Sequence, residues 1–314
     1  MATSNPRGDA QYAGMMRIGV DLGGTKIEAI ALDAAGRELA RERVATPAHD
    51  YRATVQAIAT LVKKIEHEVG GAATVGVGVP GAISPRTGVI KNANSVCLIG
   101  QPLDRDLAAA LGRPVRLAND ANCFALSEAT DGAAQGASVV FGVILGTGVG
   151  GAIVIDGQLV AGCNAITGEW GHNPLPWPDD QERPGPACYC GQRGCIETFL
   201  SGPGLERDFE ATTGHQRSAR EIAHQAEKGE EQADAVLARY ENRLARGLAS
   251  IINVLDPDVI VLGGGVSKID RLYTRVPQIW TEYIFSDTVA TRLLKAEHGD
   301  SSGVRGAARL WPPD

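Results

Sequence analysis

The chain has 314 residues, which exceeds one typical domain but falls short of three, so we expect two lobes. Hydrophobic residues make up 44% of the sequence, and no run approaches the roughly 18 consecutive apolar residues of a membrane span. The formal net charge of −7 argues against a general nucleic-acid binder. We therefore expect a cytoplasmic protein with a small-molecule partner, no membrane and no nucleic acid, and interpret residues 1–16 as a disordered tail.

The first predicted elements form a β-hairpin. Residues 17–21 and 27–32 are rich in strand-forming residues and flank a glycine turn, and residues 38–44 can add a third antiparallel strand. Behind Asp50, a plausible N-cap, apolar residues recur at helical spacing. We expect this helix to cover one face of a sheet, which residues 75–79 would extend by another strand.

The hairpin pattern returns later in the chain. Residues 139–145 and 152–155 read as strands on either side of the glycine turn 146–151, which suggests a duplicated unit. Residues 177–194 are dense in Pro, Gly, Cys and charge, and predict an irregular loop. Further helices are predicted at 103–111, 121–134 and 236–255, and further strands at 115–117 and 259–262.

Glycine turns after strands, at residues 23–25, 146–151 and 263–265, are typical of a nucleotide site because backbone N–H groups can approach phosphate oxygens there. Residues 76–81 and 146–151 also match the dinucleotide motif G-x-G-x-x-G. That motif should open a helix, whereas neither match leads into one. No P-loop sequence occurs either, so phosphate binding by the turns remains, with purely structural turns as the alternative.

A metal site is predicted from one imidazole and three thiols. His172, Cys188, Cys190 and Cys195 suit tetrahedral Zn²⁺ with no open position, although their spacing departs from the common C-x-x-C ribbon. The other three of the six cysteines are scattered, so we do not expect a disulfide scaffold. The zinc would be structural and would hold the irregular loop in shape.

Several motifs together resemble the ROK family of repressors, open reading frames and kinases. They are Asp21-Leu22-Gly23-Gly24-Thr25-Lys26, Leu145-Gly146-Thr147-Gly148-Val149-Gly150, Gly168-Glu169-Trp170-Gly171-His172 and Cys188-Tyr189-Cys190-Gly191-Gln192-Arg193-Gly194-Cys195. The resemblance implies an α/β fold of the two-lobed actin-like (ribonuclease-H-like) ATPase type, with a duplicated sheet and helix core and an interlobe cleft. We expect a small lobe at 17–118 plus about 300–314, and a large lobe with the zinc-binding loop at 119–299.

The same resemblance implies how ATP and Mg²⁺ would bind. The two glycine turns would embrace the β- and γ-phosphates, Asp21 would help to position Mg²⁺, and a third turn would lie beneath adenosine. The expected cofactor-binding residues are Asp21, Gly23, Gly24, Thr25, Lys26, Gly146, Thr147, Gly148, Gly264 and Gly265.

Asp120 is the candidate catalytic base. It follows a predicted strand and begins a predicted helix, whose N–H groups favour an ionised carboxylate. A helix cap formed by Asn119 and Asp120 is the alternative from the residues alone. In the family this pair binds the sugar, and the resemblance extends sugar binding to a set of residues: Gly81, Asn119, Asp120, Glu169, His172 and Glu197.

The resemblance implies an ATP-dependent hexose kinase and a homodimer. Residues 91–95, 172–177 and 298–303 look most similar to bacterial fructokinases, so we expect fructose to be converted to fructose 6-phosphate, with mannose and glucose as further substrates. N-acetylglucosamine or glucose kinases of the same family are the alternative. A sugar sensor or repressor is the alternative from another class, and we consider a repressor less favoured because the chain is acidic and only a short tail precedes the first strand.

Overall fold

The computed structural model describes residues 16–47, 49–93 and 95–311, which form two compact units. Unit 1 comprises residues 1–132, 158–167 and 300–314, and unit 2 comprises residues 133–157 and 168–299. The expected disordered tail lies outside the described residues except for Met16, which begins the first strand instead. No helix in the described part of the chain is long and apolar enough to cross a membrane.

Unit 1 is built on a mixed five-stranded sheet in the order β3-β2-β1-β4-β7. The strands are β1 Met16–Leu22, β2 Lys26–Leu32, β3 Glu38–Ala45, β4 Ala73–Val79 and β7 Val115–Asn119. Strands β1, β2 and β3 pair antiparallel, which confirms the predicted hairpin and its third strand, while β1, β4 and β7 are parallel.

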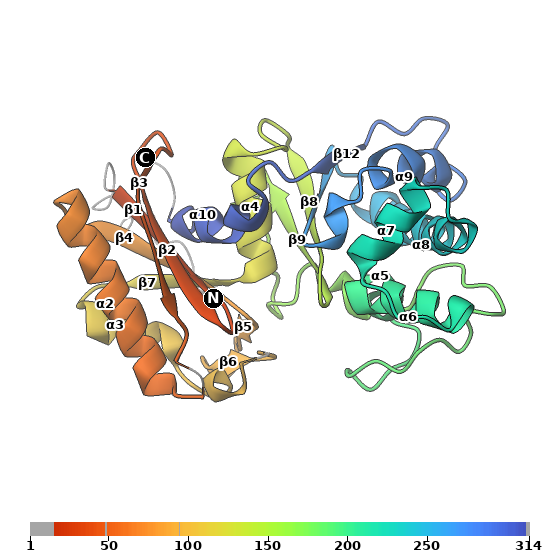
Figure 1. Cartoon of the computed structure of the whole chain (residues 1–314). Coiled ribbons are helices and arrows are strands. Elements are labelled where there is room, and N and C mark those ends of the chain that lie inside the picture. The colour runs from red at the N-terminus through yellow and green to blue at the C-terminus, as the bar shows by residue number, and fades with distance from the viewer. Residues whose placement is uncertain (1–15, 48, 94, 312–314) are drawn as a thin grey trace. The chain divides into compact units, whose positions relative to one another are not determined.

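Helices cover both faces of this sheet (Figure 1). On one face lie α2 Tyr51–Val69, capped by Asp50 as predicted, and α3 Leu103–Leu111. On the other face lie α4 Asp120–Asp131 and α10 Ser302–Ala308. Close approach explains two strand glycines: a Cβ on Gly19 or Gly76 would lie 2.0 Å or 1.9 Å from a backbone oxygen of α10. Smaller elements are β5 Ala82–Ile83, β6 Ile90–Lys91 and η2 Val96–Leu98.

The sheet of unit 2 has the order β10-β9-β8-β11-β12 and repeats the topology of the first. Its strands are β8 Val139–Leu145, β9 Val149–Ile155, β10 Gln158–Leu159, β11 Val259–Gly263 and β12 Arg292–Lys295, with β10 assigned to unit 1 by its contacts. An antiparallel hairpin of β8 and β9 again leads into parallel strands, because β8, β11 and β12 run in the same direction. The predicted duplication is therefore confirmed.

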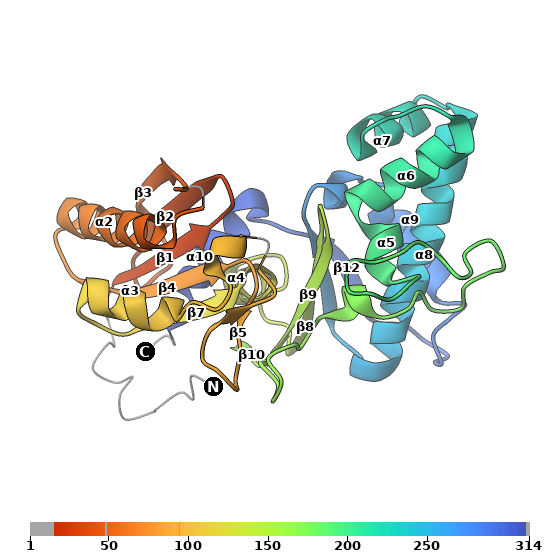
Figure 2. The ribbon, with the colours of Figure 1, turned by 90° about the horizontal axis from the view of Figure 1, so that it is seen from below.

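The helices of unit 2 lie on one side of its sheet (Figure 2). They are α5 Ile196–Leu200, α6 Gly202–Thr213, α7 Ala219–Glu227, α8 Glu231–Leu255 and α9 Leu272–Trp280, with the short 3-10 turns η3 Trp170–His172 and η4 Val266–Lys268. A further 3-10 turn, η5 Gly299–Ser301, begins at the last residue of unit 2 and continues into unit 1. The long helix α8 crosses the core, where the buried Tyr240 hydroxyl donates to the Leu200 carbonyl at 2.8 Å. Residues 177–194 form no helix or strand, as predicted, and contribute only the isolated bridge between Ala187 and Arg193.

The boundary between the units differs from the expected one at residues 118 and 119, because α4 belongs to unit 1. Three contacts hold α4 to α10: Ser302 Oγ donates to Glu128 Oε1 at 2.7 Å, and Arg305 and Arg309 both pair with Asp131. A Cβ on Gly306 would also lie 1.6 Å from the Cys123 carbonyl oxygen. The helix that begins at Asp120 is therefore packed into the same unit as Asp21.

Candidate functional site

The first glycine turn, residues 23–26, joins β1 to β2 and is fixed by hydrogen bonds within the turn and from Thr46. Gly23 N–H donates to the Lys26 carbonyl at 3.0 Å, which closes the turn. At the end of β3, Thr46 donates from its hydroxyl to the Gly23 carbonyl at 2.8 Å and from its N–H to the Thr25 carbonyl at 3.0 Å. Gly24, Thr25 and Lys26 are exposed. A fixed turn with an exposed tip is a suitable cradle for phosphate oxygens.

Asp21 lies one residue before the end of β1, next to this turn. Burial and, after it, the negative charges of Asp120 and Glu28 together raise the pKa of its carboxyl to about 6, with the Lys26 ammonium opposing the rise. A divalent cation would remove this unfavourable crowding of carboxylates. The donor set at Asp21 therefore fits the expected Mg²⁺.

Asn119 caps α4, and its side chain also binds Gly81, another predicted residue of the sugar site. Its Oδ1 accepts from Ala121 N–H at 2.8 Å, while its Nδ2 donates to the Gly81 carbonyl at 3.1 Å. Gly81 has φ +95°, and a Cβ there would lie 2.5 Å from the Lys91 carbonyl oxygen. The cap interpretation is thus confirmed for Asn119, and the same side chain fixes Gly81 next to Asp120.

Asp120 is the first residue of α4, with its Oδ1 accepting from Ala121 N–H at 2.8 Å. The residue keeps exposed surface, yet protein atoms crowd its carboxyl on the other sides and raise its pKa by desolvation. Hydrogen bonds from Ala121, its own N–H and Asn119 lower the pKa by less. The backbone N–H groups thus favour the ionised carboxylate as expected, but burial has the larger effect on the pKa. A raised pKa suits a general base that works near neutral pH.

The second glycine turn, Gly146 to Gly148, is held in the same manner within unit 2. Gly146 N–H donates to the Gly148 carbonyl at 3.0 Å and Gly202 N–H donates to the Gly146 carbonyl at 2.8 Å. Glu197 Oε2 accepts from Val149 N–H at 2.9 Å, and a Cβ on Gly148 would lie 2.6 Å from that oxygen. Glu197 therefore supports the turn and forms no salt bridge among the described residues.

Gly264 and Gly265 follow β11 and lie beside the second turn. A Cβ on Gly264, which has φ +85°, would lie 2.4 Å from the Leu145 carbonyl oxygen, immediately before Gly146. Both glycines are exposed. The structure thus brings together the residues expected near ATP in unit 2.

Glu169 precedes η3 and His172 is its last residue, and the two residues between them fix η3 to β9. Trp170 is buried, donates from its indole to the Gly150 carbonyl at 3.1 Å and packs edge-on against Phe141. A Cβ on Gly171 would lie 2.1 Å from the Val149 carbonyl oxygen. Glu169 itself is exposed, so its carboxylate is available to hydroxyl groups of a ligand.

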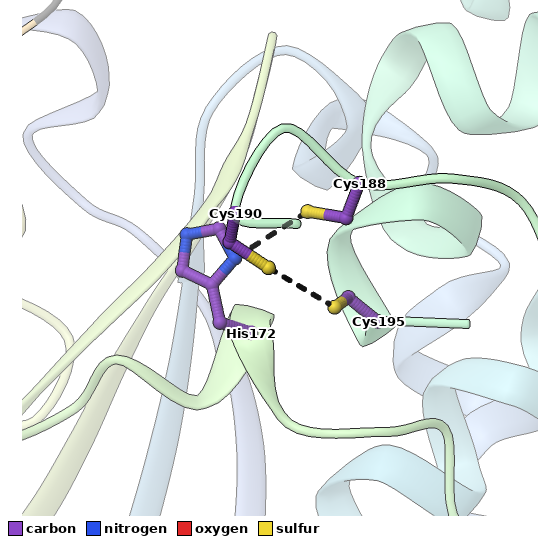
Figure 3. A group of neighbouring side chains, drawn as sticks. All are labelled: His172, Cys188, Cys190 and Cys195. Atoms are coloured by element: carbon purple, nitrogen blue, oxygen red, sulfur yellow. Dashed lines mark hydrogen bonds between the residues drawn. The ribbon is translucent and has the colours of Figure 1, made fainter. Parts of the chain in front are cut away.

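The four predicted zinc ligands converge on one point (Figure 3). One ligand atom from each of His172, Cys188, Cys190 and Cys195 lies within 4.8 Å of all the others. Cys188 Sγ is 3.6 Å from His172 Nδ1, and Cys190 Sγ is 3.6 Å from Cys195 Sγ. Tetrahedral Zn²⁺ with Zn–S bonds of about 2.3 Å would place ligand atoms roughly 3.8 Å apart. The ligand set therefore fits structural zinc, and all three cysteines are free of disulfides.

The two ring nitrogens of His172 have different neighbours. Nδ1 faces the thiol cluster, while Nε2 lies 3.0 Å from the Tyr189 hydroxyl, and the two rings meet edge to face with centroids 5.1 Å apart. A metal on Nδ1 would fix the proton on Nε2, which then donates to Tyr189. His172 was expected to bind both zinc and sugar, and Nε2, the nitrogen left for sugar, already lies in contact with the Tyr189 hydroxyl.

The predicted site residues fall into two groups, one in each unit. Unit 1 holds Asp21, the first turn, Gly81, Asn119 and Asp120, and unit 2 holds the second turn, Glu169, His172, Glu197, the cysteines, Gly264 and Gly265.

Sequence reasoning missed several supporting residues. Tyr189 stands between two metal-ligand candidates, which was an available signal. Buried Glu28 binds Arg41 and Arg43 from the next strand, and the pKa of the fully buried Cys123 is raised by burial and by Asp21 and Asp120. Both depend on strand pairing and helix packing that local sequence does not reveal.

Comparisons with known proteins agree with this geometry. The model of the ROK family matches residues 17–313. N-acetyl-D-glucosamine kinase of Vibrio cholerae is 42% identical over 94% of this chain and 99% of its own length, and that of Salmonella paratyphi B is 41% identical over 95% and 100%.

Solved structures agree as well. A ROK hexokinase from Thermus thermophilus is 34% identical with a TM-score of 0.84, covering 94% of this chain and 97% of its own. A ROK family glucokinase from Streptomyces griseus, in complex with glucose and AMPPNP, is 30% identical with a TM-score of 0.74, covering 94% and 99%. The motifs, the duplicated fold and these similarities show that the chain belongs to the ROK family.

Proposed function

We propose that this protein is an ATP-dependent hexose kinase that phosphorylates N-acetyl-D-glucosamine. The observation that supports kinase chemistry most strongly is the carboxylate of Asp120 at the start of α4, adjacent to Asp21 and close to a phosphate-type turn. The preferred sugar rests on the relatives, since N-acetyl-D-glucosamine kinases match at about 40% identity over almost the whole chain. N-acetylglucosamine therefore replaces fructose as the first candidate.

In this proposal each group has a defined task. Asp120 accepts the proton of the attacking sugar hydroxyl, and Asn119 orients the sugar from the same helix end. The exposed turns at residues 23–26 and 146–148 bind phosphate oxygens through their N–H groups. Mg²⁺, for which Asp21 is the proposed ligand, supplies neutralisation of phosphate charge.

The zinc group has a structural task in the proposal. Cys195 directly precedes α5, whose residue Glu197 holds the second turn through Val149 N–H. Pro174 and Cys195 also form an isolated β-bridge. The irregular loop of residues 177–194, which we call the metal loop, therefore connects η3 to α5. Zinc would therefore fix the positions of Glu169 and Glu197, the proposed sugar contacts of unit 2, without taking part in proton or phosphoryl transfer.

The sugar is tested by coupled ADP release with Mg·ATP and a panel of N-acetylglucosamine, glucose, fructose and mannose. We expect the highest kcat/KM with N-acetylglucosamine. Turnover that is highest with fructose would restore the first expectation and leave the mechanism intact. Absence of turnover with every sugar, in folded and zinc-replete protein, would favour the sugar sensor instead.

A further inference from the structure

A cavity of about 390 Å³ lies in unit 2, lined in part by Thr198 and Phe199 of α5. Its walls come from the loop before the metal cluster and from helices α5, α6 and α8, and the volume is in the range of small-molecule sites. We call it the arginine cavity. Its lining residues are Gln181, Arg183, Pro184, Gly185, Pro186, Thr198, Phe199, Gly204, Arg207, Asp208, Ala211 and Arg243.

The lining is positively charged although the chain carries a net charge of −7. Three arginines face one acid, Asp208. Arg243 is engaged by carboxylates on two sides, because its Nε lies 2.7 Å from Glu182 and its Nη1 lies 2.7 Å from Asp208. The charge of Arg243 is thus compensated within the protein, and the excess comes from Arg183 and Arg207.

Arg183 and Arg207 are both exposed, and other protein groups bind their guanidinium groups only weakly. Arg207 donates to the Thr198 carbonyl, a neutral acceptor, and forms no ion pair among the described residues. Arg183 pairs at 3.2 Å with Asp180, whose side chain is fully exposed, and such surface pairs contribute little. Two guanidinium groups with spare N–H donors match the oxygens of a phosphate group.

The rest of the lining is mixed. Gln181 and Asp208 offer polar groups to hydroxyls, while Pro184, Pro186 and Phe199 provide apolar surface. We propose that the arginine cavity binds a phosphate monoester of a small hydroxylated compound, with the phosphate held by Arg183 and Arg207. This site is separate from the proposed sugar and ATP residues.

The cavity shares its walls with the metal loop and with α5. Thr198 and Phe199 belong to the helix that carries Glu197, and Thr198 Oγ1 donates to the carbonyl of the metal ligand Cys195 at 2.7 Å. A Cβ on Gly185, which lines the cavity, would lie 2.5 Å from Gly194 Cα, next to the metal ligand Cys195. The part of the loop that lines the cavity therefore packs directly against the part that leads to the metal ligands. A bound ester would therefore contact the elements that position the proposed sugar site.

The test is calorimetric titration of the full, zinc-loaded chain with glycerol 3-phosphate, N-acetylglucosamine 6-phosphate and inorganic phosphate, without ATP. Glycerol 3-phosphate should bind once per chain and more tightly than inorganic phosphate. In Arg183→Ser/Arg207→Ser its dissociation constant should rise at least about tenfold, because hydrogen bonds to charged groups are lost. Because N-acetylglucosamine 6-phosphate would also bind the proposed sugar site as the product, only the part of its binding that is lost in Arg183→Ser/Arg207→Ser is assigned to the cavity.

Arg217→Ser/Arg220→Ser is the matched control, since both arginines are exposed in unit 2 and neither lines the cavity. It removes the same charge and should bind glycerol 3-phosphate like the wild type. Equal weakening in both double variants, or no heat from either ester with the wild type, would overturn the proposal. Arg183→Ser alone, which removes only a surface ion pair, keeps the test available if the cavity double variant fails to fold.

Discussion

The carboxylates of unit 1 and the metal loop of unit 2 are positioned by different physical means. Asp21 and Asp120 sit at the ends of a strand and a helix, where backbone hydrogen bonds and close glycine packing fix them. Residues 177–194 contain no helix or strand, and Cys188 and Cys190 in this segment belong to the cluster of three thiols and an imidazole that fits the proposed zinc. In the proposed mechanism, proton transfer therefore depends on residues held by regular structure, whereas the sugar contacts of unit 2 depend on zinc ligation.

The largest expected effect comes from Asp120→Asn. The amide keeps the shape of the side chain but cannot accept a proton, so kcat should fall about 10²- to 10⁴-fold. Melting temperature should stay close to that of the wild type, because the helix cap is made by Asn119. Asp287→Asn, an exposed position in unit 2, is the control and should retain full activity. A loss below fivefold in Asp120→Asn would exclude this residue as the base.

The second effect concerns the thermal stability that the metal ligands give to the loop of residues 177–194. Cys195→Ser removes a buried thiolate from the zinc cluster and should lower the melting temperature by more than about 5 °C in differential scanning calorimetry, since the loop has no regular structure of its own. Cys163→Ser changes an exposed cysteine outside the cluster and is the matched control. Equal melting temperatures of the two variants, in zinc-replete buffer, would contradict a structural metal.

The third effect is a pH dependence that belongs to unit 1. Burial and the neighbouring carboxylates raise the pKa of Asp21 to about 6, and burial raises that of Asp120. In the proposed mechanism both carboxylates act in their ionised form. Activity should therefore fall as the pH decreases through about 6, well above the ordinary carboxyl value near 4. The measurement is kcat/KM for the sugar against pH, with circular dichroism to verify folding.

Lys26 sharpens this third prediction. Its ammonium lowers the pKa of Asp21, so Lys26→Met should move the acidic limb to higher pH. Activity that stays constant down to pH 4.5 in the folded wild type would show that neither carboxyl has a raised pKa in the working enzyme.

The smallest expected effect comes from Tyr189→Phe. The variant loses the hydroxyl at 3.0 Å from His172 Nε2, and a hydrogen bond of this kind contributes about 0.5–1.5 kcal/mol. We expect a change in KM for the sugar of roughly two- to tenfold, with kcat retained. Tyr283→Phe, which alters a tyrosine whose ring packs at a tilt against Trp177, is the control. If kcat drops instead, Tyr189 has a role in the chemistry.

Local sequence patterns predicted the features that depend on neighbours in the chain. The hairpins, helix α2 behind Asp50, the glycine turns and the four metal-ligand candidates all follow from spacing and residue type. The boundary at Gly132 could not be predicted, because it depends on the packing of α4 against α10 from the other end of the chain. The contact of Glu197 with Val149 N–H was missed for the same reason. The homodimer expected from the family stays a prediction.

The most direct test of the different roles of the two regions is the steady-state kinetics of N-acetylglucosamine phosphorylation before and after zinc removal. The account predicts that KM for the sugar rises at least about fivefold in the folded, zinc-depleted protein while kcat at saturating sugar stays within about twofold, since zinc positions the sugar contacts but not Asp120. A fall in kcat with an unchanged KM would contradict that division of roles.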